Sequence, residues 1–329
     1  LDTAFLRFIA ILLITNSHLD KLYPVSAMAT GGQLGNSLFF MPSGFGLAAS
    51  YRKKGDVFWP WLQRRLARIY PSVLLVSLTA AFITGAVVEW GVVDYVRHLL
   101  WPTDYWFVAA IVCFYAPFFW LMRLRRKTVF LQLIGLLCLP YFYFYLTALD
   151  LSRFSVEEGY FKWIFYFQIM LLGGFLANRD SVSKPMVSAS WNTVLLGLFV
   201  MAYFALKLLV AKGGMTELQF LIHWLTFPIM LFSLFAMDTR LVKEKIMKSV
   251  AAPFIALVAG ATLEIYLLQK YVYGNSFVSA LAFPGNVAVF WPVVIAGAIL
   301  IAWVSARGSR YLAGWVRPLS AAAFGRSEK

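Results

Sequence analysis

Long apolar runs separated by short polar segments follow one another along the whole chain. A run of about 20 apolar residues is long enough to cross the hydrocarbon core of a bilayer as a helix. The charge clusters between the runs predict about ten spanning helices, over residues 4–20, 34–50, 70–88, 105–122, 128–147, 163–178, 191–210, 218–237, 251–272 and 287–305. This pattern predicts an all-α integral membrane protein with one transmembrane domain over residues 1–329.

The composition supports the membrane class. Of the 329 residues, 61% are hydrophobic and 13% are charged, whereas a soluble domain is about half apolar and a quarter charged. These values exclude a secreted disulfide scaffold, a disordered protein and an ordinary cytosolic enzyme. The two cysteines, Cys113 and Cys138, lie in apolar runs without the spacing of metal ligands, so no metal is expected.

The net charge of +14 is distributed unevenly between the two sides of the predicted bundle. Most of the 29 Lys and Arg residues fall in the segment 51–69, in the loops near 123–127, 179–190 and 238–250, and in the tail from 306. By the positive-inside rule this side is cytoplasmic, which places both termini in the cytoplasm. The basic excess therefore indicates topology and contact with anionic lipid, and nucleic acid is not expected as a partner.

The first span carries polar and ionisable groups where a bilayer makes them costly. Arg7 and His18 are eleven residues apart, which on a helix returns to within about 20° of the same face. In one interpretation Arg7 reaches lipid headgroups and His18 caps the span. In the other the pair is catalytic, because a histidine is suited to general-base catalysis near neutral pH. Asn16 and its polar neighbours favour the catalytic interpretation.

A basic segment precedes the third span. Arg64, Arg65 and Arg68 form a cationic stripe on a predicted helix. Such a stripe is typical of an interfacial helix that lies on anionic lipid. It also suits the phosphates of a cytoplasmic ligand, because the planar guanidinium of Arg binds phosphate in a defined geometry.

Two further spans contain residues that are unusual in a membrane helix. Pro42, Gly44 and Gly46 predict either a weakened helix with free backbone groups or a kink at which another helix packs closely. Glu264, in the ninth span, needs a cation or must be protonated, and Arg7 is one candidate cation. His98 and His223 favour a structural interpretation.

Together these motifs resemble the acyltransferase-3 family of bacterial integral-membrane acyltransferases. Arg7 and His18 match the family pattern of an Arg or Lys followed, after ten residues, by a His. The other matching segments are the aromatic-rich Ser-Gly-Phe helix at Ser43, the R-x-x-R stretch with its Pro at 65–71, the Trp motif at Trp106 and the late helix at 264–268. In two places the chain departs from the family: Pro42 replaces a common Leu or Val, and Gln269 replaces a common His, which leaves more of the acid–base work to His18.

The resemblance implies transfer of an acyl group, most often acetyl, from cytoplasmic acyl-CoA to a hydroxyl of an extracytoplasmic or lipid-linked glycan. It places the protein in the bacterial cytoplasmic membrane. His18 would be the general base and Arg7 would orient the donor or the developing negative charge; an acyl-His intermediate is the alternative to direct transfer. The implied donor-binding residues are Arg64, Arg65, Arg68, Ser43 and Trp106, and the implied orienting or channel residues are Asn16, Glu264, Tyr266 and Gln269.

A transporter or flippase of a lipid-linked saccharide is the main alternative from another functional class. Charges within helices and broken helices also mark substrate pathways in transporters. Such a protein needs no acyl donor, so binding of acetyl-CoA distinguishes the two hypotheses. A structural membrane scaffold is the third possibility.

Overall fold

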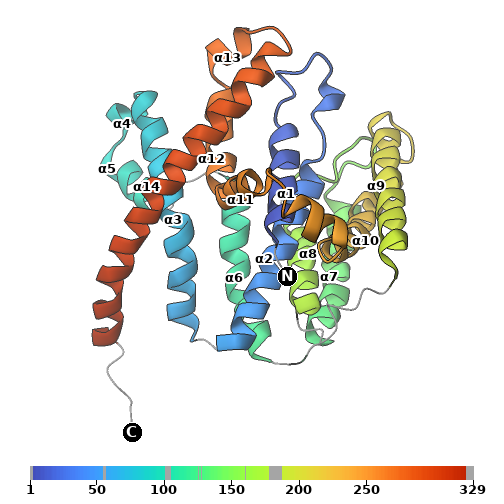
Figure 1. Ribbon diagram of the computed structural model, residues 1–329, viewed down its shortest axis with the longest axis horizontal. Coiled ribbons are helices and arrows are strands. Elements are labelled where there is room, and N and C mark those ends of the chain that lie inside the picture. The colour runs from blue at the N-terminus through green and yellow to red at the C-terminus, as the bar shows by residue number, and fades with distance from the viewer. Residues whose placement is uncertain are drawn as a thin grey trace. The chain divides into compact units, whose positions relative to one another are not determined.

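The computed structural model describes residues 3–54, 57–100, 105–124, 126, 128–159, 161–177 and 187–323. Within this part of the chain the secondary structure is helical and contains no β-strand (Figure 1). The prediction of an all-α membrane protein is confirmed. Parts of the predicted basic loops near 123–127 and 179–190 lie outside the described residues.

The described helices follow the order of the apolar runs. They are α1 (Ala4–Asn16), α2 (Gly32–Lys54), α3 (Phe58–Ile83), α4 (Ala86–Glu89), α5 (Val92–Leu100), α6 (Trp106–Arg123), α7 (Thr128–Thr147), α8 (Phe161–Ala177), α9 (Ala189–Ala211), α10 (Phe220–Ala236), α11 (Ala252–Gly260), α12 (Thr262–Tyr273), α13 (Ser276–Ala280) and α14 (Gly285–Ala323). Short helical turns add η1 (Ser26–Met28), η2 (Thr216–Leu218) and η3 (Leu241–Ile246).

Each of the ten predicted spans coincides with one helix, except the ninth, which covers two, and the helices differ in length. By length and composition, α3, α6, α7, α9 and α14 can cross a membrane, and α11 with α12 forms a further, bent candidate. Helices α1, α8 and α10 are apolar but shorter. The chain is therefore a multi-pass membrane protein, and the count of ten spans stays a prediction.

Two predicted boundaries are wrong for the same physical reason. Helix α3 begins at Phe58 and not near residue 70, so the basic segment forms its first turns. Helix α14 likewise continues beyond residue 305 to Ala323. Arginine is a good helix former, so a basic residue ends an apolar run without ending the helix. Pro60 is tolerated because the N–H groups of a first helical turn have no acceptor within the helix.

The predicted ninth span, 251–272, is broken. Helix α11 ends at Gly260, α12 begins at Thr262, and the two helices are bent by 75°. Between them Ala261 has φ −98° and ψ 17°, outside the helical region. Glycine is a poor helix former, which favours a break at this place. The break leaves helix ends within an apolar segment, where backbone groups need partners.

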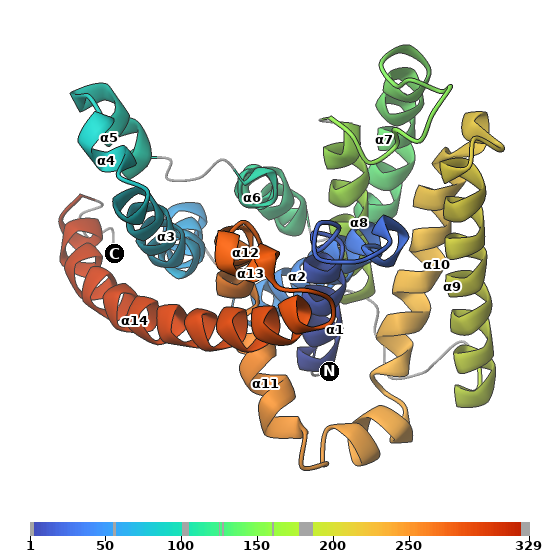
Figure 2. The same ribbon diagram turned by 90° about the horizontal axis from the view of Figure 1, so that it is seen from above.

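The chain divides into two compact units. The first unit comprises Leu1–Ile14, Gly31–Gly55 and Phe118–Ala259, and the second comprises Thr15–Thr30, Asp56–Pro117 and Gly260–Lys329. In the first unit, α8 packs against α2 and α7, and α10 packs against α9 and α2. In the second unit, α3, α12 and α14 pack against one another (Figure 2).

The contact between α2 and α8 is made by the backbones themselves. A Cβ atom added to Gly44 would lie 2.0 Å from the Met170 carbonyl oxygen, and one added to Gly173 would lie 2.0 Å from that of Met41. Only glycine fits at either position. Helix α2 runs unbroken through Pro42. Of the two interpretations of its Pro and Gly residues, close helix packing is therefore the one that the structure shows.

His223 occupies the core of the first unit, as the structural interpretation requires. Its side chain is buried, and its ring stacks on Phe165 with the centroids 3.9 Å apart. Nδ1 of His223 is 2.9 Å from the Tyr141 hydroxyl, and the two atoms share a hydrogen bond. This pair satisfies polar groups inside an apolar bundle. The His98 side chain lies outside the described residues.

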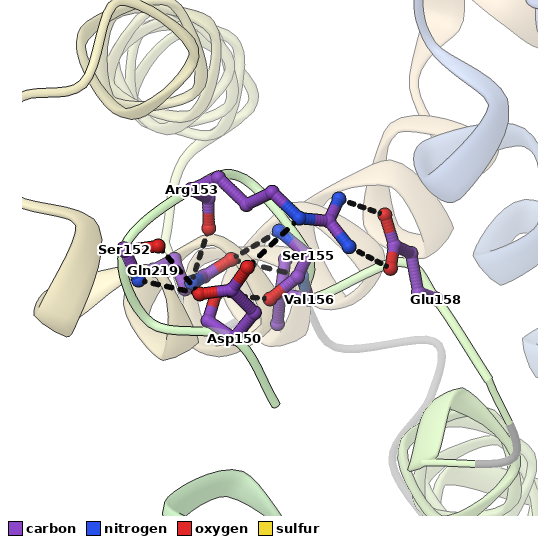
Figure 3. A network of polar contacts seen from close by, with 7 residues as sticks. All are labelled: Asp150, Ser152, Arg153, Ser155, Val156, Glu158 and Gln219. Carbon is purple, nitrogen blue, oxygen red and sulfur yellow. Dashed lines mark hydrogen bonds and ion pairs between the residues drawn. The ribbon is translucent and has the colours of Figure 1, made fainter. Parts of the chain in front are cut away.

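A network of polar contacts holds the loop between α7 and α8 (Figure 3). The buried Gln219 Oε1 accepts hydrogen bonds from the N–H groups of Ser155 and Val156, at 2.9 and 2.8 Å. Gln219 Nε2 donates to the Arg153 carbonyl oxygen at 3.1 Å. The Arg153 guanidinium forms ion pairs with Asp150 at 3.0 Å and with Glu158 at 2.5 Å. One buried amide and one exposed guanidinium thus organise the loop.

The exposed carboxylates of this loop favour their charged forms. Hydrogen bonds from Ser152 lower the pKa of Asp150, and the hydrogen bond from Arg153 lowers the pKa of Glu158. A carboxyl whose pKa is lower in the folded state adds stability above its ordinary pKa and loses that contribution as the pH falls through the lowered value. The ion pairs are therefore intact at neutral pH and are lost only in acid, as the pH falls through the lowered pKa values.

We expect Gly44→Ala to destabilise the protein by about 1–3 kcal/mol, because the added methyl group forces α2 away from α8. Gly46→Ala is the matched control: it lies two residues along the same helix, and nothing lies within 4 Å of its added Cβ. Thermal unfolding in detergent measures both variants. Equal melting temperatures for the two variants would contradict the close approach of the helices.

We expect Gln219→Leu to cost about 1–3 kcal/mol, because two buried N–H groups lose their acceptor. Arg153→Gln should leave the stability nearly unchanged, since exposed ion pairs contribute little. Hydrogen exchange at Ser155 and Val156, measured with the melting temperature, separates the two effects. Faster exchange in the Arg153 variant than in the Gln219 variant would show that the guanidinium, and not the buried amide, holds the loop.

Candidate active site

His18 lies in a turn directly after α1 and not within it. Helix α1 ends at Asn16, and the His18 N–H donates to the Thr15 carbonyl oxygen at 3.0 Å. The prediction that Arg7 and His18 share one helix face is therefore wrong. Asn and Ser side chains compete with the backbone for hydrogen bonds and favour helix ends, which explains why the polar run 15–18 ends the helix. The His18 side chain is exposed.

The side chain of Asn16 holds the loop that carries His18. Its Nδ2 donates to the carbonyl oxygens of Met28 and Thr30, at 2.9 and 3.0 Å. Its Oδ1 accepts a hydrogen bond from the Tyr23 hydroxyl at 2.6 Å. Both ends of the amide are thus used within the second unit, and the contacts fix the path of residues 17–30.

Arg7 belongs to the first unit, where it contacts the end of α11. Its Nη1 donates to the Ala259 carbonyl oxygen at 3.4 Å. Carbonyl groups at a helix C-terminus have no partner within the helix and carry a partial negative charge, so a guanidinium is favourable there. Phe8 packs edge-on against Phe254, with the ring centroids 6.2 Å apart, in the same contact.

Glu264 is buried in the first turn of α12, directly after the break. Its Oε1 accepts a hydrogen bond of 2.5 Å from the Ser72 hydroxyl of α3. The charge of Arg68, also on α3, interacts electrostatically with the same carboxylate. Within the second unit, Arg68 is thus a cation near Glu264. A negative charge is also favourable at the N-terminus of a helix.

The cationic stripe of α3 lies beside α6. The Arg65 guanidinium lies over the ring of Trp61, 5.6 Å from its centroid. Trp61 is fully buried and packs edge-on against Tyr115 of α6, with the centroids 5.6 Å apart. Arg65 is half-buried, whereas Arg64 and Arg68 are exposed. The arrangement presents two exposed guanidinium groups on the same helix as a third that lies over a buried aromatic ring, which suits an anionic ligand.

Aromatic residues connect the start of α6 to α12. Trp106 opens α6, and the ring of the buried Tyr266 lies 5.1 Å from that of Phe107, centroid to centroid. The Tyr105 hydroxyl donates to the Leu267 carbonyl oxygen at 2.7 Å. Gln269 is buried on the same helix, and its Oε1 has no hydrogen-bond partner within the described residues.

Ser43 belongs to the first unit, and its hydroxyl donates to the Phe39 carbonyl oxygen of its own helix at 2.7 Å. The first unit also contains Arg7. The other predicted site residues belong to the second unit: His18, Asn16, Arg64, Arg65, Arg68, Trp106, Glu264, Tyr266 and Gln269.

Three contacting residues were not predicted. Ser72 follows Arg64 and Arg68 at intervals of four residues, so the period of the cationic stripe was a signal for it. Tyr105 and Tyr273 meet their partners only through tertiary packing. The ring of Tyr273 lies parallel to that of His18, at 11° and with the centroids 6.4 Å apart. No local pattern in the sequence distinguishes these two tyrosines.

Comparison with known protein families finds one match. A model of the acyltransferase-3 family, described as an acyltransferase domain, matches residues 4–307. No curated protein and no solved structure matches the chain. The match covers nearly the whole chain and includes both the His18 loop and the cationic stripe, which confirms the resemblance seen in the motifs. The chain therefore belongs to the acyltransferase-3 family and is a multi-pass membrane acyltransferase.

Proposed function

We propose that this acyltransferase moves an acyl group, most often acetyl, from cytoplasmic acyl-CoA to a hydroxyl of an extracytoplasmic or lipid-linked glycan. The observation that carries the proposal is that one compact unit contains both an exposed imidazole, His18, and a guanidinium cluster on α3. These are the groups needed for proton transfer and for phosphate binding. We place the protein in the bacterial cytoplasmic membrane with both termini in the cytoplasm, as the distribution of basic residues favours.

The guanidinium cluster suits the donor. Arg64 and Arg68 are exposed, and Arg65 is supported by the buried Trp61. Coenzyme A carries a 3′-phosphate and a pyrophosphate, and Arg binds such groups through paired N–H donors. The Glu264 carboxylate interacts with Arg68, which limits the positions available to that guanidinium before donor binds. Trp106 and Ser43 are also proposed as donor-binding residues, because they match motifs of the family.

The proposed chemistry is direct transfer. His18 accepts the proton of the acceptor hydroxyl while the oxygen attacks the thioester carbonyl. The carbon–sulfur bond then breaks, and the protonated imidazole returns the proton to the departing thiolate. Arg7 orients the donor or stabilises the negative charge that develops on the carbonyl oxygen. The products are an O-acyl glycan and free coenzyme A.

The predicted orienting or channel residues have different contacts and therefore different proposed roles. Asn16 supports the His18 loop through three hydrogen bonds and so acts on catalysis through His18. Glu264 and Tyr266 brace α12 against α3 and α6. Gln269 differs, because its buried Oε1 has no partner within the described residues. A buried acceptor of this kind is costly unless a ligand supplies the hydrogen, so we assign Gln269 to the channel.

We expect the double variant Arg65→Ala, Arg68→Ala to weaken acetyl-CoA binding at least about 10-fold, because charge-assisted hydrogen bonds to phosphate are lost. Arg123→Ala is the matched control, since Arg123 also lies over a tryptophan, 5.0 Å from the ring centroid of Trp120. Isothermal titration of the detergent-purified protein measures both. Equal affinity in the double variant and the native protein would favour the transporter hypothesis, which needs no acyl donor.

We expect His18→Ala to bind acetyl-CoA as the native protein does but to release coenzyme A at least about 100-fold more slowly, because a general base is lost. The assay follows thiol release with water as the acceptor. His223→Ala is not a suitable control, since His223 is buried in the core. Lys21→Ala changes an exposed residue of the same loop and serves instead. Thiol release at the native rate by the His18 variant would remove His18 from the mechanism.

A further inference from the structure

The orientation of the His18 ring needs a support outside its own loop. The backbone at His18 is held by its hydrogen bond to Thr15, and Asn16 fixes the loop. The side chain nevertheless extends from an exposed turn and has two rotatable torsions. A general base works only when a ring nitrogen faces the proton that it accepts, and in many enzymes a third group holds the base in that orientation.

Tyr273 contacts His18 in a geometry that restricts the imidazole. The two rings are nearly parallel, at 11°, and their centroids are 6.4 Å apart, which is an offset stack. Tyr273 is half-buried and is the last residue of α12. The carboxylate of Asp20, two residues after His18, interacts electrostatically with Tyr273. The phenol is therefore confined between α12 and the His18 loop.

The helix that carries Tyr273 is itself braced. The Tyr105 hydroxyl bonds the Leu267 carbonyl oxygen at 2.7 Å, and the Tyr105 ring packs on Tyr266 at 5.4 Å between centroids. The Lys270 ammonium lies 5.9 Å from the centroid of the Tyr105 ring. These contacts tie α12 to the start of α6. The tyrosine next to His18 thus belongs to a helix that is held by its neighbour.

We propose that Tyr273 is a positioning residue for His18, a proposal that rests on the proposed role of His18 as the general base. The stacked phenol holds the plane of the imidazole so that a ring nitrogen faces the acceptor hydroxyl. When His18 takes the proton, the resulting imidazolium is stabilised by the electron-rich face of the neighbouring ring. The proton then passes to the sulfur of coenzyme A as the carbon–sulfur bond breaks, so Tyr273 gains and loses no proton.

The test compares Tyr273→Leu with Tyr273→Phe in the full-length, detergent-purified protein. The first removes the ring, and the second keeps it and removes only the hydroxyl. Tyr143→Leu is the matched control, because it makes the same change at an exposed position of α7 in the first unit. The probe is acetyl-CoA with water as the acceptor, and thiol release gives kcat and KM separately.

We expect Tyr273→Leu to lower kcat by about 10- to 100-fold with KM for acetyl-CoA unchanged, since a misplaced catalytic group slows the chemical step. Tyr273→Phe should keep kcat within about twofold of the native value, because the stacking ring is retained. Tyr143→Leu should match the native protein. The proposal is overturned if Tyr273→Leu keeps the native kcat, or if Tyr273→Phe or Tyr143→Leu loses as much activity as Tyr273→Leu.

His18→Ala, measured in the same assay, separates this proposal from the proposed function. If His18→Ala is inactive and Tyr273→Leu is fully active, the positioning role alone is wrong and the general base stands. If His18→Ala is fully active, the general base is wrong, and the positioning role fails with it. A normal melting temperature for Tyr273→Leu excludes unfolding as the cause of a lower kcat.

Discussion

A carboxylate buried beside a broken helix must be partnered, and the second unit meets this requirement at Glu264. The Ser72 hydroxyl bonds the carboxylate at 2.5 Å, the Arg68 charge lies near, and the N-terminus of α12 adds a favourable dipole. Removing one partner of a buried charge lowers the stability of the fold by more than the intact contact adds to it. Glu264 therefore depends on the Ser72 hydroxyl, the Arg68 charge and the N-terminus of α12 together. The contact ties α12 to α3, and the cationic stripe of α3 is thereby fixed relative to the helix that ends at Tyr273.

The His18 loop is held by similar means. Asn16 uses both ends of its amide within the loop, and the buried Asn286 Nδ2 donates to the Leu22 carbonyl oxygen at 2.7 Å. These hydrogen bonds hold the backbone of a loop that is largely exposed. The same side chains therefore fix the turn that carries His18.

The positions of most helices and the family could be predicted from the sequence, because apolar runs and short motifs are local signals. The ends of helices were less predictable: Arg64 and Arg68 end an apolar run but continue α3, and Asn16 ends α1 inside one. The helix that packs against Gly44 could not be predicted, because the approach of α2 to α8 depends on packing between distant segments. Tyr273 was missed because a ring contact between distant segments leaves no local pattern in the sequence, whereas Ser72 continues the four-residue spacing of Arg64 and Arg68 and could have been predicted.

The proposed function is the transfer of an acyl group from a cytoplasmic donor to an acceptor, with His18 as the general base. The most direct measurement supplies radiolabelled acetyl-CoA to inverted membrane vesicles that contain the native protein or the His18→Ala variant, and then follows the label into the glycan and lipid-linked saccharide fraction. If His18 is the general base of acyl transfer, label appears in that fraction with the native protein, and none appears above background with the variant. Equal labelling by both proteins, or no labelling by the native protein in vesicles that supply the saccharide, would contradict it.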